Sequence, residues 1–137
     1  MMELPDNATI LWWLRLVLLG ALVVILGDAT LDKVRNWSGA VAFTREHFAQ
    51  TRLRALSTPL LAILSVMMGL ATLGCLAGMV QLLVGSPPVF GFHGAVLASL
   101  SFLALLFGHQ IAGNLAGANA IVPLLVLSVL AVASFLG

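Results

Sequence analysis

The chain has 137 residues, of which 61% are hydrophobic and only 8% are charged, and its mean hydropathy is +1.14. Globular domains in water carry about 25% charged residues, so this composition excludes a water-soluble protein and makes the lipid bilayer its main partner. The formal net charge of +1 supplies no positive field, so nucleic acid is not expected as a partner. The single cysteine, Cys75, excludes an internal disulfide and a multi-cysteine metal site.

The charged residues all precede Ala55, and residues 55–137 contain no Asp, Glu, Lys or Arg. Because a membrane-spanning helix needs about 20 mainly apolar residues, the apolar segments predict spans at about 10–27, 59–84, 90–111 and 120–136. The Gly-Ser-Pro-Pro run at 85–88 and the Gly- and Asn-rich run at 113–119 separate the later spans. Lipid offers backbone groups no partners, so each span is helical. The sequence therefore predicts an all-α fold, an integral membrane four-helix bundle forming a single domain over residues 1–137.

The first loop, residues 28–58, contains a second kind of helical pattern. From Ser38, a suitable N-cap, helical spacing places Trp37, Val41, Thr44 and Phe48 on one side, together with Ala55. This pattern predicts a short amphipathic helix in the first loop. Two interpretations remain open: the helix lies in the membrane interface, or it packs on the bundle as a solvated loop helix.

The basic residues indicate an orientation. Five of the six lie in the first loop: Lys33, Arg35, Arg45, Arg52 and Arg54. Because short loops rich in Lys and Arg stay in the cytoplasm, we expect the first loop to be cytoplasmic and both termini to lie outside. The expected location is the cytoplasmic (inner) membrane of a bacterium.

Polar residues near one end of the predicted bundle form a candidate ligand-binding site. They come from the ends of the first and third spans, which lie on the same side of the membrane. The candidates are Asp28, Asp32, Lys33, His109, Gln110 and Asn114. One hypothesis is a site for a quinone or a similar amphiphile, in which His109 or Gln110 donates to a carbonyl and an acidic residue exchanges the proton. The alternative is that these groups only pair with one another and fix the helix ends.

An intrachain haem or metal is not expected. His93 and His109 are sixteen residues apart on the third span, which is about 24 Å along a helix. His47, the remaining histidine, lies in the first loop. The sequence therefore predicts no metal site within the chain and leaves a quinone as the candidate cofactor.

Aromatic and basic residues at the span ends are candidate interface anchors, because such side chains favour the headgroup region. They are Trp12, Trp13, Arg15 and Trp37. For Arg15 a second interpretation is open, an interior cation that awaits a carboxylate or a ligand.

Two glycine motifs are candidate helix-packing seams, since small residues let membrane helices approach closely. One contains Gly74 and Gly78, and the other Gly113 and Gly117. They serve packing inside the chain, or association with a membrane-protein partner or a second copy.

Several short motifs in this order resemble the DoxX family of small membrane proteins. They are Arg15 with Gly20 and Gly27, the pairs Asp32-Lys33 and Trp37-Ser38, the segment 45–48, the proline-led second span, and the segments 107–112 and 117–118. The resemblance implies a four-span bundle with the first loop tucked against it, and a role in membrane oxidoreductase systems, which include relatives of a thiosulfate–quinone oxidoreductase subunit. Two departures are the lack of an acidic residue at 66–69 and of a basic residue at 84–89.

The leading functional hypothesis is therefore an accessory or quinone-proximal subunit of a membrane oxidoreductase system. A non-catalytic structural or assembly subunit of a larger membrane complex is the alternative, and a small transporter of an uncharged amphiphile is a weaker one. Residues 55–137 carry no charge, so no charge-lined pathway supports transport. The sequence leaves open whether the chain catalyses a reaction.

Overall fold

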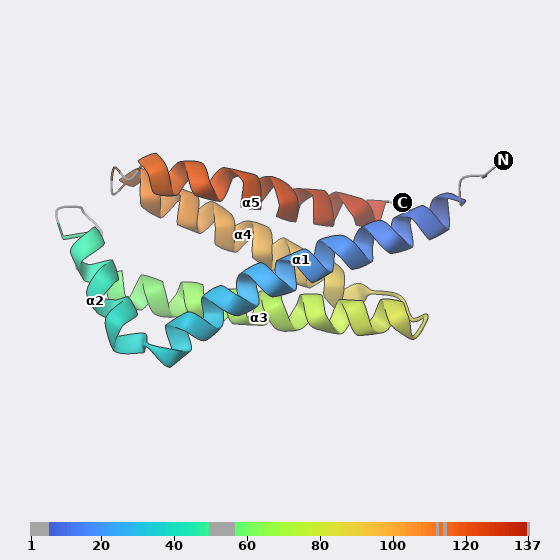
Figure 1. Cartoon of the computed structure of the whole chain (residues 1–137), viewed down its shortest axis with the longest axis horizontal. Helices are drawn as coiled ribbons and strands as arrows, with labels where there is room; N and C mark the ends of the chain where they lie inside the picture. Colours follow the sequence, from blue (N-terminus) through green and yellow to red (C-terminus); the bar gives the residue numbers. More distant parts are fainter. Residues whose placement is uncertain (1–5, 50–56, 112, 114, 137) are drawn as a thin grey trace.

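The computed structural model describes residues 6–49, 57–111, 113 and 115–136. Within these residues the chain forms five α-helices and one short 3₁₀ helix. Their bounds are α1 Asn7–Arg35, α2 Trp37–His47, α3 Ser57–Leu83, α4 Val89–Ile111, α5 Leu115–Ala133 and η2 Ser134–Leu136. Four helices run along the molecule, and α2 lies at one end (Figure 1). The predicted all-α bundle, with a short helix between its first two spans, is confirmed.

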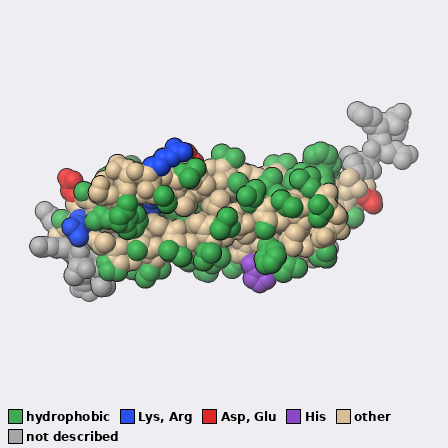
Figure 2. Space-filling model, turned by 90° about the horizontal axis from the view of Figure 1, so that it is seen from below, with side chains coloured by type: hydrophobic (Ala, Val, Ile, Leu, Met, Phe, Trp, Pro, Cys, Tyr) green, Lys and Arg blue, Asp and Glu red, His purple; other side chains and the backbone are tan. Residues whose placement is uncertain are grey.

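The four long helices are suited to a bilayer in length and composition. They are Asn7–Arg35, Thr58–Leu83, Val89–Ile111 and Ala116–Leu136. Their outward faces are apolar, and Val24 and Leu73, for example, are 71% and 63% exposed. Figure 2 shows hydrophobic side chains along the molecule and most of the visible charged ones toward the end that carries α2. The protein is therefore an integral membrane protein with four spans.

The first span helix is longer than the sequence predicts, because α1 continues past Gly27 to Arg35. Residues 28–35 contain neither Pro nor Gly, so nothing in the backbone ends the helix where the apolar run ends. The 29 residues of α1 extend about 43 Å at about 1.5 Å per residue. Since the hydrocarbon core is about 30 Å thick, the charged last turns of α1 extend beyond it.

Helix α2 begins with a different cap from the predicted one. Asn36, not Ser38, is the N-cap, and its Oδ1 accepts a hydrogen bond of 3.3 Å from the Gly39 N–H. Both residue types cap well, so the sequence alone does not decide between them. The helix packs against α1 and α3, and its place relative to the membrane interface stays a prediction. The predicted contribution of Ala55 lies outside the described residues.

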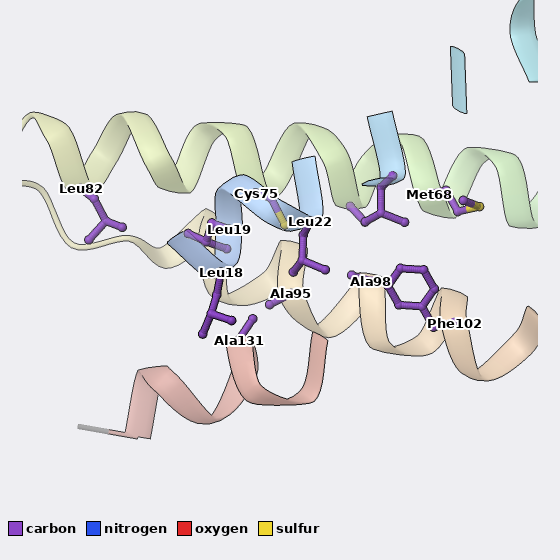
Figure 3. Packing of buried hydrophobic residues seen from close by; sticks show 12 residues of the cluster. Leu18, Leu19, Leu22, Met68, Cys75, Leu82, Ala95, Ala98, Phe102 and Ala131 are labelled. Atoms are coloured by element: carbon purple, nitrogen blue, oxygen red, sulfur yellow. The ribbon is translucent and has the colours of Figure 1, made fainter. Parts of the chain in front are cut away.

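The core lies where leucines of α1 meet small residues of the other spans. Leu19, Leu22 and Leu26 are fully buried. Figure 3 shows Leu19 and Leu22 beside Cys75 of α3 and Ala95 of α4. Small partners let the helices approach closely, which is how membrane helices gain packing energy in the absence of a hydrophobic drive between them.

Helices α3 and α4 touch backbone to backbone through glycines. A Cβ placed on Gly74 would lie 2.9 Å from the Cα of Gly94, and one placed on Gly78 would overlap the Cα of Gly91. The motif of Gly74 and Gly78 therefore packs inside the chain. From this contact the two helices diverge toward the end that carries α2 (Figure 1).

The second glycine motif does not lie on one helix. Gly113 adopts a φ of +73° in the turn after α4, a left-handed conformation that glycine adopts at low cost. Helix α5 already begins at Leu115, so Gly117 belongs to α5 and not to a separating loop. Pro123 accordingly lies inside α5 and not in its opening turn. Among the described residues of the run 113–119, only Gly113 has a positive φ, and α5 begins at Leu115.

Candidate functional site

A pocket of about 760 Å³ lies among α1, α2, α3 and α4, at the end where α3 and α4 diverge. It is partly open, and most of the side chains around it are apolar. Residues from α1 and the following turn are Ala29, Asp32, Lys33 and Asn36. Residues from α2 and its end are Gly39, Ala40, Phe43, Thr44 and Phe48. The α3 wall is Leu60, Leu61, Ile63, Leu64 and Met67, and the α4 wall is Ala104, Leu105, Phe107, Gly108 and His109.

The polar part of the pocket comes from the end of α1, from α2 and from the last turn of α4. Asp32 and Lys33 occupy the last turn of α1, and His109 occupies the last turn of α4. Lys33 and His109 are half-buried, and Asp32 is exposed. An ammonium donates hydrogen bonds, a carboxylate accepts them, and an imidazole does either. This end of the pocket can therefore bind a small polar group by both donation and acceptance.

Phe48 closes the pocket against α4 because position 108 is a glycine. A Cβ on Gly108 would lie 3.3 Å from Cζ of Phe48, a tight contact that would displace the ring. Phe48 directly follows α2, whose last backbone bond runs from the Phe48 N–H to the Thr44 carbonyl at 3.0 Å. The position of the ring is thus fixed by the end of α2, and it links α2 to α4 across the pocket.

Three of the six residues predicted as ligand-binding line this one pocket: Asp32, Lys33 and His109. Asp28 and Gln110 are exposed and are not among the lining residues. Asn114 lies outside the described residues. Ligand binding by all six stays a prediction, and the pocket supports it for the first three.

Sequence reasoning missed the contribution of α2 to this pocket. Asn36, Phe43 and Thr44 line it, although the predicted helix side grouped Thr44 with Trp37 and Val41. The available signal was the pair of small residues Gly39 and Ala40 beside Phe43, since small residues mark the side of a helix that approaches another helix closely.

The predicted anchors at the opposite end make specific contacts between helices. Trp12 Nε1 donates a 3.0 Å hydrogen bond to the carbonyl of Leu82 at the end of α3. Arg15 Nε donates a 2.9 Å bond to the carbonyl of Ser134, and its guanidinium lies 5.0 Å from the centroid of the Phe135 ring. Arg15 thus satisfies a carbonyl of η2, the turn that follows α5, a role that neither interpretation from the sequence included. Anchoring by Trp13 and Trp37, which are 57% and 40% exposed, stays a prediction.

The described residues contain no group of three His, Cys, Asp or Glu side chains that could hold a metal ion. His93 lies at the other end of α4 from His109, and its Nδ1 is 2.9 Å from the carbonyl of Val89. The two histidines therefore do not approach one another. Cys75, on α3, is buried in the core.

Comparison with protein-family models finds no match for this chain, and comparisons with curated proteins and with solved structures find none either. The resemblance to the DoxX family therefore stays an interpretation of the motifs. What the fold itself establishes is a four-span helical membrane protein with a pocket at the end that carries α2.

Proposed function

We propose that this chain is an accessory subunit of a membrane oxidoreductase system and holds a quinone in the pocket at the α2 end. The single observation that carries the proposal is that Lys33 of α1 and His109 of α4 line one mainly apolar pocket at the end of the bundle. Ligand pockets combine an apolar lining with a few polar groups that orient the ligand. The DoxX-like motifs support the association with a redox system.

The polar groups match the chemistry of a quinone head. Its carbonyl oxygens accept hydrogen bonds, which Lys33 and His109 can donate. Asp32 is adjacent to Lys33. It can exchange a proton with the quinone when the enzyme of the oxidoreductase system changes the oxidation state of that quinone. In this role the chain binds and orients the ligand, and the electrons come from the other subunits of the system.

Binding to purified protein tests the proposal. We expect decyl-benzoquinone to raise the unfolding temperature in detergent, and Lys33→Met and His109→Ala to remove most of that increase. His93→Ala is the matched control, because His93 lies on the same helix outside the pocket, and it should respond like the wild type. An unfolding temperature that does not change with quinone would refute the proposal.

The structural or assembly role is the second candidate, but the structure removes one of the surfaces that such a role was expected to use. This role was predicted to use two glycine seams, and the residues of one of them, Gly74 and Gly78, face α4 inside the chain. A partner would then have to use the lipid-facing side chains. Substituting Leu73, which is 63% exposed on α3, should release such a partner in a pull-down, whereas His109→Ala should not.

A transporter of an uncharged amphiphile receives less support, since the lining residues of the pocket lie at one end of the bundle. Counter-flow of a labelled quinone across liposomes tests it directly, and the binding role predicts none.

The proposed orientation places α2 on the cytoplasmic side of a bacterial inner membrane. It rests on the basic residues Lys33, Arg35 and Arg45 near α2. In intact cells a membrane-impermeant maleimide should label Ser86→Cys, in the turn between α3 and α4, and should leave Ser38→Cys unlabelled. The wild type is the background control because Cys75 is buried; the reverse labelling pattern would invert the orientation.

A further inference from the structure

The shape of the pocket carries information about the ligand beyond its head group. On the α3 side the pocket extends from Leu60 to Met67, which is about 10 Å along the helix axis at about 1.5 Å per residue. Its charged residues and its histidine all lie near the α2 end: Asp32, Lys33 and His109. The α3 wall is made entirely of Leu, Ile and Met. The pocket is therefore polar at one end and apolar along its length.

The lipid-facing side of the pocket is bordered by two apolar side chains from the diverging helices. Ile63 of α3 is 62% exposed and Phe107 of α4 is 64% exposed, and both line the pocket. Because outward-facing side chains of two spans line it, the pocket borders the bilayer at these two positions. We call Ile63 and Phe107 the portal.

The divergence of α3 and α4 makes room for the pocket at this level. The glycines Gly74 and Gly94 hold the two backbones together deeper in the bundle. Toward the α2 end the helices separate (Figure 1), and the ring of Phe48 lies against Gly108 of α4 there.

Resting on the proposed function, we infer that the ligand is a quinone with a single long apolar tail, and that the tail leaves the pocket sideways through the portal. The head then lies at Lys33 and His109 and the tail follows Met67 and Ile63 into the leaflet nearest α2. The portal residues thereby contact the apolar tail, while the polar end of the pocket binds the head by hydrogen bonds. Asp32 and Lys33 border the same end with opposite charges, so the phosphate of a diacyl phospholipid gains no net charge attraction there.

The experiment compares two probes on purified protein by isothermal titration in detergent, with micelle partitioning subtracted. One probe is a dimethoxy-methyl-benzoquinone without a tail, and the other is the same ring with a decyl chain. We expect the decyl probe to bind about tenfold more tightly than the tail-less probe. Burial of several methylenes releases more free energy than a tenfold ratio of dissociation constants requires.

The variant Ile63→Ala/Phe107→Ala should weaken binding of the decyl probe about fivefold and leave the tail-less probe unchanged. The matched control is Val66→Ala/Leu103→Ala, at lipid-facing positions of the same helices that are 62% and 52% exposed and lie outside the pocket. This control should bind both probes like the wild type. Unchanged unfolding temperatures in both double variants verify that the fold is intact.

Each other outcome has a distinct meaning. Equal binding of both probes, with no effect of the portal variant, would overturn the inference while leaving the head-group site in place. Displacement of the decyl probe by phosphatidylglycerol at equal concentration would overturn the single-tailed ligand. Binding of neither probe would refute the proposed function, and the inference with it.

Discussion

Gly78 of α3 and Gly91 of α4 bring two membrane helices into direct backbone contact. A Cβ on Gly78 would overlap the Cα of Gly91 and would also lie 3.2 Å from Cδ1 of Leu19. Three helices thus converge at one glycine. The contact fixes α3 and α4 at this level, and their divergence from it leaves room for the pocket at the α2 end (Figure 1).

We expect Gly78→Ala to destabilise the protein by about 1–3 kcal/mol, because the new methyl meets backbone that cannot move aside. The measurement is the unfolding midpoint in mixed micelles followed by circular dichroism. Gly20→Ala is the matched control, since its Cβ would lie 3.5 Å from Cε of Met79, an ordinary contact. Equal midpoints for the two variants would show that the α3–α4 contact is looser than described.

Trp12→Phe should cost about 1 kcal/mol, because it removes the Nε1 donor and leaves the Leu82 carbonyl without that bond. Trp13→Phe keeps an aromatic ring at an adjacent position that is 57% exposed, so its effect should be smaller. The same unfolding assay measures both. A larger loss in the Trp13 variant would contradict a structural role for the Trp12 bond.

Arg15→Lys should loosen the turn η2, because lysine lacks the Nε–H that reaches Ser134 and the planar group that stacks on Phe135. We expect amide hydrogen exchange at residues 134–136 to become about tenfold faster, in line with the loss of a bond from a charged donor. Val17→Ala, at an outward position of α1 that is 64% exposed, is the control. If exchange at the turn is unchanged, Arg15 acts at the headgroups alone.

The first turn of α1 should depend on pH through Asp6. The pKa of Asp6 lies below its ordinary value of 3.8 because Thr9 donates hydrogen bonds to its carboxylate, one of them from the backbone N–H at 3.0 Å. A lowered carboxyl pKa means that the stabilisation is complete above the ordinary value and is lost as the pH falls through the folded value. The Thr9 amide signal in NMR should therefore report fraying in acid. In Asp6→Asn the cap remains and this pH dependence should vanish.

The sequence predicts the spans well because backbone groups in hydrocarbon must hydrogen-bond within their own segment, which makes each apolar segment a helix. The breaks at Gly85 and Gly113 are predictable because glycine is the residue suited to a positive φ. The meeting of Lys33 and His109 at one pocket also follows, since an even number of crossings returns the chain to the same side. Helix rotation does not follow from composition. The sequence therefore does not reveal that Asp28 and Gln110, which are as polar as the lining residues, lie outside the pocket.

The parts that sequence reasoning missed depend on tertiary contacts of small residues. Phe48 lies close to α4 because Gly108 has no side chain, and a glycine in a span gives no sign of which residue will pack against it. Arg15 satisfies the Ser134 carbonyl, a pairing between residues at opposite ends of the chain. Local propensity carries no information about such contacts.

The most direct test of the quinone site is photolabelling in lipid nanodiscs with an azido-quinone, followed by mass spectrometry of the labelled fragments. The proposed function predicts label on α1 near Lys33 and on α4 near His109, with both signals reduced by excess decyl-benzoquinone. Label centred on α5 or near His93, or label that excess quinone does not reduce, would contradict it.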